Sequence, residues 1–399
     1  MIPINSTIRL VTRIFGLLLL TIGGSTQAIK LTATDATLNN FGISVSTSGN
    51  RAAIGANYDV TNGGNSGSVY IFELLAGKWT QTAKLLATDG TSGDLFGYSV
   101  SILGDRVLIG AYLDDEKGRA SGSAYVFDFL DGSWVQTAKL QATDGVAGAQ
   151  FGVAVSLSGD RALIGAKGDK QKARFSGSAY IFDLVDGRWS QATKLIAKDG
   201  TAFANFGNSV SLSGNRALIG ASGDDTNGKF SGSAYIFELS AGSWSQAAKL
   251  IADDTTESDL FGTAVSLSGN RALIGASGDD DNGNASGSAY IFELSAGYWS
   301  QTTKLLAIDG TEYDDFGSSV SLSGNQVLIG AKFDDDNGSD SGSAYMFTLS
   351  ASGWSQTRKL IAQDGTQGDR FSMSVSVSSD RALLGADVAN SVYIVPAQK

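Results

Sequence analysis

The strongest constraint on this chain is an internal repeat of 55 residues. A Phe at the start of an apolar stretch recurs at this spacing seven times, and all six Trp residues recur at the same spacing. In a repeat protein each unit is one supersecondary element that is stabilised by its neighbours, so the repeat sets the architecture. The Phe series is Phe41, Phe96, Phe151, Phe206, Phe261, Phe316 and Phe371, and the Trp series is Trp79, Trp134, Trp189, Trp244, Trp299 and Trp354.

Each unit contains four candidate β-strands. In the fifth unit they are residues 261–268, 271–276, 287–294 and 299–307, separated by turn and loop segments. The 51 Gly and only two Pro of the chain fit many short strands joined by tight turns. Four antiparallel strands repeated radially form the blades of a β-propeller. We therefore predict an all-β, seven-bladed β-propeller of four-stranded antiparallel blades. A stacked solenoid is the alternative, but β-solenoid coils are commonly about half this length.

The two ends of the chain bear on ring closure. The seventh unit stops after its third strand, whereas residues 28–33 match the outer strand of other units, such as residues 83–87. We expect the N-terminal strand to complete the last blade, because a closed ring leaves no open sheet edge.

The repeated segments resemble the FG-GAP repeats of the integrin α-subunit propeller and, more closely, those of bacterial secreted FG-GAP repeat proteins. The resemblance rests on FG-x-S-V-S-L-S-G-N-R-A-L-I-G-A and G-S-A-Y-I-F and covers essentially all of the chain from residue 29. It implies a seven-bladed extracellular propeller, frequently tied to adhesion or ligand recognition, with calcium in some members. It also implies that ligands bind the face that carries the longer connections.

The N-terminus has the pattern of an export signal. Arg9 and Arg13 supply positive charge, residues 14–23 form an apolar run, and small residues follow at 25–28. We expect a signal peptide over residues 1–28 and the propeller over 29–399; an uncleaved anchor is the alternative. The apolar run is short for a membrane span, so we expect no span after cleavage and a secreted, periplasmic or cell-surface protein.

Composition excludes several kinds of chemistry. The chain has no Cys and no His, which removes thiolate nucleophiles, disulfides, Cys- or His-ligated metals and the Ser/His/Asp triad. The net charge of −11 argues against general binding to nucleic acid. We expect no certain cofactor and a monomeric protein.

Antiparallel strand order places the short turns between strands 1 and 2 and strands 3 and 4 on one face. The longer connections between strands 2 and 3, and between blades, lie on the other face, which we call the loop-rich rim. Variable loops on a repetitive scaffold commonly carry specificity. Charge varies along this rim, because the loops of blades 4 to 6 are acidic whereas the blade 3 loop is basic. The candidate ligand contacts are Lys167, Lys170, Lys172, Arg174, Asp224, Asp279, Asp281, Asp314, Asp334 and Asp336, and solvated loops are the alternative.

The Asp-rich loops are also weak candidates for calcium. Aligned with an EF-hand loop, the blade 5 loop lacks the first carboxylate, with Gly278 in its place, and has Ala289 where the bidentate Glu belongs. Blades 4 and 6 fail in the same way, and the strand 1–2 turns lack the integrin-type motif. The remaining metal candidates are Asp225, Asp280 and Asp335.

Two other series are interpreted as structural. The Trp residues stand near the start of the outer strands, where packing between blades explains them. An Arg follows the first turn of each blade except at Gln326, and it is expected to support that turn; the series is Arg51, Arg106, Arg161, Arg216, Arg271 and Arg381.

Three hypotheses for function follow. The first is a secreted or surface-exposed, non-enzymatic propeller that binds an extracellular protein or glycan through the loop-rich rim. The second is a carboxylate-based glycoside hydrolase or lyase that acts on a polysaccharide. The third is a purely structural component of the envelope.

Overall fold

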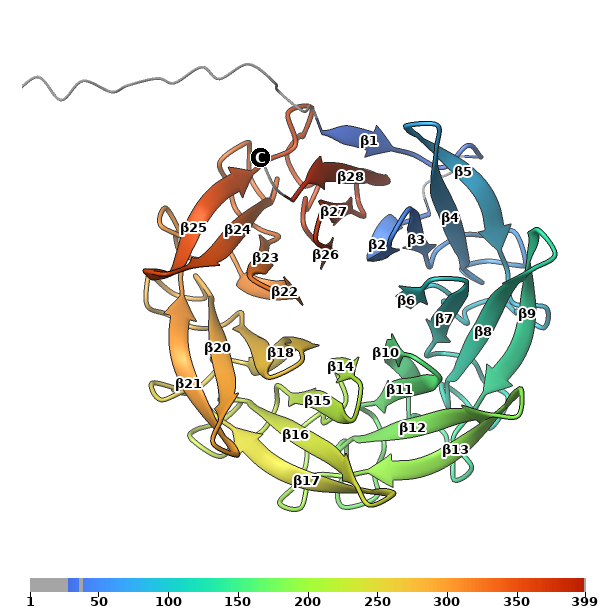
Figure 1. Ribbon diagram of the computed structural model, residues 1–399, viewed down its shortest axis with the longest axis horizontal. Coiled ribbons are helices and arrows are strands. Elements are labelled where there is room, and N and C mark those ends of the chain that lie inside the picture. The colour runs from blue at the N-terminus through green and yellow to red at the C-terminus, as the bar shows by residue number, and fades with distance from the viewer. Residues whose placement is uncertain (1–27, 36–38, 398–399) are drawn as a thin grey trace, which may run out of the picture.

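Seven four-stranded sheets form a ring around a central axis (Figure 1). This computed structural model describes residues 28–35 and 39–397, and all sheets pair antiparallel. The predicted all-β, seven-bladed β-propeller is confirmed. The predicted signal peptide lies outside the described residues except for Ala28. Within the described ranges no helix has the length and hydropathy needed to cross a membrane.

In blades 1 to 6 the four strands run in chain order from the axis to the outside, and in blade 7 the outermost strand is the N-terminal one. The innermost strands are β2 (Phe41–Ser48), β6 (Ser99–Leu103), β10 (Phe151–Ser158), β14 (Val210–Ser213), β18 (Phe261–Ser268), β22 (Phe316–Ser323) and β26 (Ser374–Val377). The second strands are β3 (Arg51–Ala56), β7 (Arg106–Ala111), β11 (Arg161–Ala166), β15 (Arg216–Ala221), β19 (Arg271–Ala276), β23 (Gln326–Ala331) and β27 (Arg381–Ala386).

The outer half of each blade is equally regular. The third strands are β4 (Ser68–Leu75), β8 (Ser123–Leu130), β12 (Ser178–Val185), β16 (Ser233–Ser240), β20 (Ser288–Ser295), β24 (Ser343–Ser350) and β28 (Ser391–Pro396). The outermost strands are β5 (Lys78–Leu85), β9 (Ser133–Leu140), β13 (Arg188–Leu195), β17 (Ser243–Leu250), β21 (Tyr298–Leu305), β25 (Gly353–Leu360) and β1 (Ile29–Leu31).

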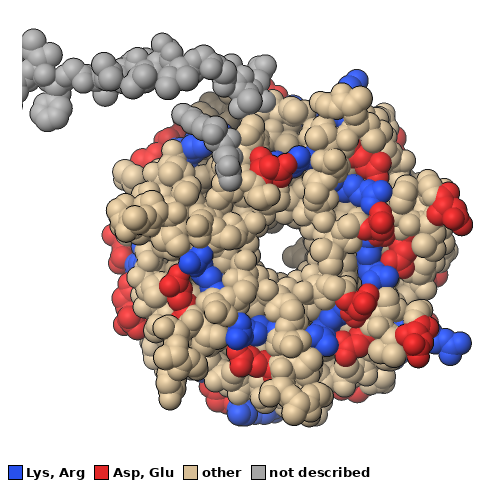
Figure 2. All heavy atoms as spheres, viewed as in Figure 1, with Lys and Arg blue, Asp and Glu red and all other residues tan. Residues whose placement is uncertain are grey.

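The N-terminal strand closes the ring, as expected from the sequence. β1 pairs with β28 through Ile29–Ile394, Lys30–Tyr393 and Leu31–Val392, so the seventh blade takes three strands from the C-terminus and one from the N-terminus. A space-filling view shows a channel through the centre of the ring, with charged groups of both signs around it (Figure 2).

The hydrophobic core lies between blades. In one cluster, Ile236 and Leu250 of blade 4 pack with Phe261, Tyr290 and the partly buried Trp299 of blade 5, and all seven clusters draw residues from two neighbouring blades in this way. Phe261 packs edge-on against Tyr290 at a centroid distance of 5.5 Å, an arrangement that aromatic rings favour.

Glycines allow the inner strands of neighbouring blades to approach closely. Gly275 lies at the end of β19, and a Cβ built on it would be 2.0 Å from the carbonyl oxygen of Gly317 in blade 6. Gly317 itself has a φ of 91°, which residues other than Gly rarely adopt. In the seventh unit Ser372 replaces this second Gly at a φ of 76°, and its hydroxyl donates to the carbonyl of Ser343 at 2.6 Å.

A ring of serine hydroxyls joins the innermost strands. The Oγ of Ser211 in blade 4 accepts a hydrogen bond from the backbone N–H of Leu267 in blade 5 at 2.9 Å. The same bond occurs at all seven blade boundaries, with the pairs Ser46–Ile102, Ser101–Leu157, Ser156–Leu212, Ser211–Leu267, Ser266–Leu322, Ser321–Val377 and Ser376–Thr47.

The Arg and Trp series meet between blades on the face of the short turns. The Arg271 guanidinium binds Glu293 of its own blade at 2.8 Å and lies 5.3 Å from the ring centroid of Trp354 in blade 6. Gln326 interrupts the series where the next blade has no Trp, and its amide instead donates to the carbonyl of Ala397 at 3.3 Å. These contacts support the structural interpretation of both series.

The close approach of glycines generates a test of the packing between blades. Gly275→Ala should lower the free energy of unfolding by about 1–3 kcal/mol, since the added methyl group overpacks the boundary with blade 6. Gly64→Ala is the matched control, because a Cβ there meets only the Ser92 hydroxyl at 3.5 Å. Urea unfolding measures both variants, and equal stability of the two would contradict the packing described here.

Candidate functional site: the loop-rich rim

The loop-rich rim is built from two kinds of connection. In blade 5 they are residues 277–287, between β19 and β20, and residues 251–260, which lead from β17 of blade 4 into β18. Antiparallel strand order brings the two together, and the Gly278 N–H donates to the carbonyl of Asp259 at 3.1 Å. The Ser258 N–H also donates to the carbonyl of Lys229, in the strand 2–3 loop of blade 4, at 2.9 Å.

A buried aspartate anchors the strand 2–3 loop in blades 1 to 6. Asp279 is 3% exposed and accepts hydrogen bonds from the Tyr290 hydroxyl at 2.7 Å and the Ser288 hydroxyl at 2.8 Å. Its backbone carbonyl accepts the Gly287 N–H at 2.9 Å, which closes the loop. The equivalent buried residues in blades 1 to 6 are Asp59, Asp114, Asp169, Asp224, Asp279 and Asp334.

A lysine of the outer strand links this aspartate to the neighbouring blade. The Lys304 ammonium lies 2.9 Å from Asp279, 2.6 Å from Asp281 and 2.7 Å from Asp254, and Asp254 follows the outer strand of blade 4. We call this set of Asp, Tyr, Lys and neighbouring-blade Asp the aspartate clasp. The other lysines of the clasp are Lys84, Lys139, Lys194, Lys249 and Lys359, while in blade 7 Lys30 binds Asp364.

The clasp fixes the charge states of its members. Burial raises the pKa of Asp279, but hydrogen bonds from Tyr290 and Lys304 outweigh it and hold the pKa below the ordinary value. Burial and the adjacent Asp279 charge raise the pKa of Tyr290 well above its ordinary value, so its hydroxyl stays a donor.

Several acidic residues predicted as ligand contacts lie inside the rim. Asp224, Asp279 and Asp334 are at most 3% exposed within the clasp. Asp314 is 3% exposed and accepts the Thr311 N–H at 2.7 Å. For these four the expectation of a surface contact has to be corrected, because their carboxylates are directed into internal hydrogen bonds. Asp281 and Asp336 are exposed, and each is paired with the clasp lysine of its own blade.

The three weak metal candidates stabilise their own loops. The Oδ1 atoms of Asp225, Asp280 and Asp335 each accept the backbone N–H five residues later, at 2.8 Å. Among residues 28–35 and 39–397, no group of three acidic side chains is placed to hold a metal ion.

The basic loop of blade 3 has a mixed character. Lys170, Lys172 and Arg174 are exposed, and the Lys172 ammonium donates to the carbonyl of Lys198. Lys167 is partly buried, and burial lowers its pKa.

The loop-rich rim also carries aromatic residues that sequence reasoning missed, of which Phe203 and Phe230 are exposed and Phe175 is partly buried. Phe175 and Phe203 lie with ring centroids 5.8 Å apart, and the Arg174 guanidinium is 5.4 Å from both rings. In blade 4, Lys229 and Phe230 align with Arg174 and Phe175, and the Lys229 ammonium lies 5.2 Å from the ring of Phe230. We call these five residues the rim patch. Phe203 is 43% and Phe230 37% exposed.

The phenylalanines of the rim patch occupy strained backbone positions. Phe175, Phe203 and Phe230 have φ values of 53°, 65° and 56°, in a region that is unfavourable for bulky side chains. Most other blades use smaller residues here: Asn65, Ala120, Ala285 and Asp340 align with Phe175, and Gly93, Gly148, Ser258 and Gly368 align with Phe203. This departure from the repeat is the sequence feature from which the rim patch could have been predicted.

The clasp predicts a large difference between two neighbouring aspartates. Asp279→Asn should lower the free energy of unfolding at pH 7 by about 1.5–3 kcal/mol, because charge-assisted hydrogen bonds are lost. Asp281→Asn, whose side chain is 51% exposed, should cost less than about 1 kcal/mol.

The same pair tests the lowered pKa. A lowered carboxyl pKa contributes stability above the ordinary Asp value, and this stability is lost as the pH falls below about 4. The difference between wild type and Asp279→Asn should therefore shrink in acid. Parallel curves of unfolding free energy against pH would show that Asp279 is not held in its charged form.

Comparison with known proteins agrees with this geometry. A solved chain in a crystal structure of the mitotic checkpoint complex superposes with a TM-score of 0.56 at 12% identity, covering 97% of this chain and all of that one, which is a likeness of fold. An F-box/kelch-repeat protein of Arabidopsis thaliana is 27% identical over 188 residues, which is 47% of this chain and 49% of that protein; the chain thus spans about half the length of this relative. The FG-GAP repeat model matches seven times, at residues 25–72, 79–127, 134–182, 189–237, 244–292, 299–347 and 354–394. The chain therefore belongs to the FG-GAP repeat family.

Proposed function

We propose that this protein is a secreted or surface-exposed, non-enzymatic propeller that binds an extracellular protein or glycan through the loop-rich rim of blades 3 and 4. An FG-GAP propeller is consistent with protein interaction or adhesion. The rim patch is the observation that carries the proposal, because strained aromatic residues at the surface of an otherwise regular ring have no evident role in folding.

The chemistry of the rim patch indicates the kind of partner. Phe175 and Phe203 offer an apolar surface beside the positive charge of Arg174, and Phe230 lies beside that of Lys229. Aromatic and Arg side chains are enriched among the residues that dominate binding energy. The best fit is a protein surface that combines apolar and acidic groups.

The clasp supports a role without catalysis. Asp224, Asp279 and Asp334 hold loops and bind lysines in the same way on each of their blades. A carboxylate-based glycosidase needs two carboxyl groups in different environments, whereas these have equivalent ones. The rim patch favours binding over catalysis and over a purely structural role.

The proposal predicts that removing the aromatic rings of the rim patch abolishes ligand binding without lowering the stability of the propeller. The triple variant Phe175→Ala, Phe203→Gly and Phe230→Ala replaces each aromatic side chain by Ala or Gly. Other blades carry these residue types at the equivalent positions. Relief of the strained backbone should leave the free energy of unfolding unchanged or raise it by about 1 kcal/mol, while binding is lost.

The measurement is binding of the purified propeller to arrays of extracellular matrix proteins and glycans, with stability followed by urea unfolding. Tyr313→Gly is the matched control, since Tyr313 is an exposed aromatic residue with a φ of 69° on another part of the rim. Array binding that the triple variant retains in full, or that Tyr313→Gly abolishes equally, would refute a site on blades 3 and 4.

A further inference from the structure

Three equivalent hollows lie on the face of the short turns, opposite the loop-rich rim. Their volumes are ≈ 360, 300 and 220 Å³ in blades 3, 4 and 5. Each is lined by a Ser, a turn residue, an Arg, a carboxylate and a Leu. The three sets are Ser158, Asp160, Arg161, Asp183 and Leu184; Ser213, Asn215, Arg216, Glu238 and Leu239; and Ser268, Asn270, Arg271, Glu293 and Leu294.

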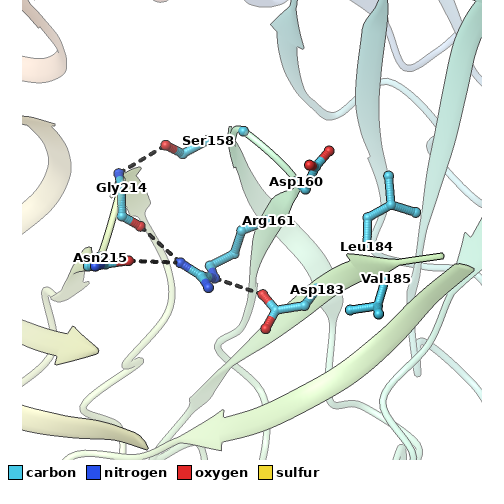
Figure 3. Close-up of a pocket in the computed structure, with 9 residues that line it drawn as sticks. Ser158, Asp160, Arg161, Asp183, Leu184, Val185, Gly214 and Asn215 are labelled. Carbon is cyan, nitrogen blue, oxygen red and sulfur yellow. Dashed lines mark hydrogen bonds and ion pairs between the residues drawn. The ribbon is translucent and has the colours of Figure 1, made fainter. Parts of the chain in front are cut away.

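The polar groups of a hollow are only partly used. Arg161 donates through Nε to Asp183 at 2.7 Å and through Nη1 to Gly214 and Asn215 of blade 4 (Figure 3). Within the described part of the chain, Nη2 of Arg161 and Oδ2 of Asp183 form no hydrogen bond. The pairs Arg216–Glu238, at 2.6 Å, and Arg271–Glu293, at 2.8 Å, leave the same two groups free among the described residues.

Blades 3 to 5 differ from their neighbours in access to the carboxylate. The side chains of Asp183, Glu238 and Glu293 are 31%, 36% and 36% exposed. The equivalent Glu73 and Asp128 are 16% exposed, and Asp128 also accepts the Thr137 hydroxyl. The three hollows thus coincide with three accessible carboxylates.

The free groups specify the chemistry of a ligand. A guanidinium N–H beside a carboxylate oxygen supplies a donor and an acceptor, which match two adjacent hydroxyl groups. The Arg and carboxylate charges cancel, so an uncharged ligand avoids the repulsion that an acidic sugar meets at the carboxylate. The volumes lie near or below the lower end for small-molecule sites, which fits a single ring, and the Leu gives that ring an apolar contact.

We propose that the hollows of blades 3, 4 and 5 each bind one neutral sugar ring. Three sites held by one rigid ring bind a branched or repeating glycan through avidity, although each site alone is weak. This inference is independent of the proposed function, because the hollows and the rim patch lie on opposite faces and are tested by different variants.

The remaining blade boundaries provide an internal control. In blade 6 the Arg and carboxylate are replaced by Gln326 and Thr348, which pair across β23 and β24. In blade 7 Arg381 pairs across the sheet with Pro396 and binds Asp380 instead, while lying 5.2 Å from the Trp79 ring. Trp79 therefore reports on a boundary without the strand carboxylate.

The six tryptophans allow six of the seven boundaries to be observed separately. Trp244 lies 5.4 Å from Arg161 and Trp354 lies 5.3 Å from Arg271, while Trp299 lines a groove with Arg216 and Glu238. The full chain labelled with 5-fluorotryptophan is titrated with methyl glucoside, methyl mannoside, methyl galactoside and N-acetylglucosamine, followed by fluorine NMR. For at least one sugar, the signals of Trp244, Trp299 and Trp354 should shift saturably at millimolar concentrations while that of Trp79 stays fixed.

Two further titrations, with an acidic sugar and with a polysaccharide, define the ligand. Glucuronic acid should bind more weakly than the neutral glucoside, and a polysaccharide of the recognised sugar should bind more tightly per ring than the free sugar. Tight binding of the free sugar without any gain from the polysaccharide would identify a free sugar, not a glycan, as the ligand, and would overturn the role of avidity.

The variant Glu238→Gln tests the assignment to a single hollow. Gln keeps an acceptor for Arg216, so the fold is preserved, which the ligand-free fluorine spectrum verifies. The affinity reported by Trp299 should fall about tenfold or more, since a hydrogen bond to a charged group is lost, while Trp244 and Trp354 respond as before. Glu257→Gln, in an exposed rim loop, is the control. Absence of saturable shifts with every neutral sugar, equal shifts at Trp79, or an unaltered Trp299 response in Glu238→Gln would overturn the proposal.

Discussion

Among the residues that the structure describes, no blade of this propeller has a hydrophobic core of its own. Each of the seven clusters lies between two sheets, as when Ile236 of blade 4 packs with Phe261 of blade 5. A blade is therefore stable only with neighbours on both sides, and the ring has to close. Closure depends on β1, whose Leu31 is buried with Phe41 and Ile394 at the boundary of blades 7 and 1. The close glycine contacts and the serine ring then fix the spacing of the blades around the channel.

The aspartate clasp carries the same constraint out to the loop-rich rim. Asp279 joins a loop, the third strand and the outer strand of its blade, and Lys304 extends the set to Asp254 of the preceding blade. Six blades use this device, so the rim is held uniformly and a loop can vary in sequence without losing its position. The strained Phe175 and Phe203 occur on such a supported loop and connection, where the surrounding hydrogen bonds can bear an unfavourable backbone conformation.

The fold could be predicted from the sequence because the repeat fixes the number of blades and the pattern of each strand. Boundaries shifted by one or two residues for physical reasons: β20 begins at Ser288, since Gly287 instead forms a bridge to Phe316 of the next blade. The family resemblance predicted a face for ligands, but not the residues on it.

The rim was predicted less well, because burial of a carboxylate depends on partners distant in the sequence. Asp279 looked like one of three equivalent acidic residues, yet Tyr290 and Lys304 stand 11 and 25 positions later, and the same spacing recurs in blades 1 to 6. This spacing could have separated the buried aspartates from the exposed ones. The Arg–carboxylate hollows could not have been found, since they depend on how far each turn leaves its carboxylate exposed.

The dependence of every core on two blades is tested most directly at the closing strand. Leu31→Asp places a charge in the boundary cluster and should lower the free energy of unfolding by about 3 kcal/mol or more. Hydrogen exchange should then speed up throughout blades 7 and 1, including β2 and β3, because their shared core is lost. Faster exchange confined to β1 and β28, with an unchanged unfolding midpoint, would show that the blades are stable without closure and would contradict the central claim.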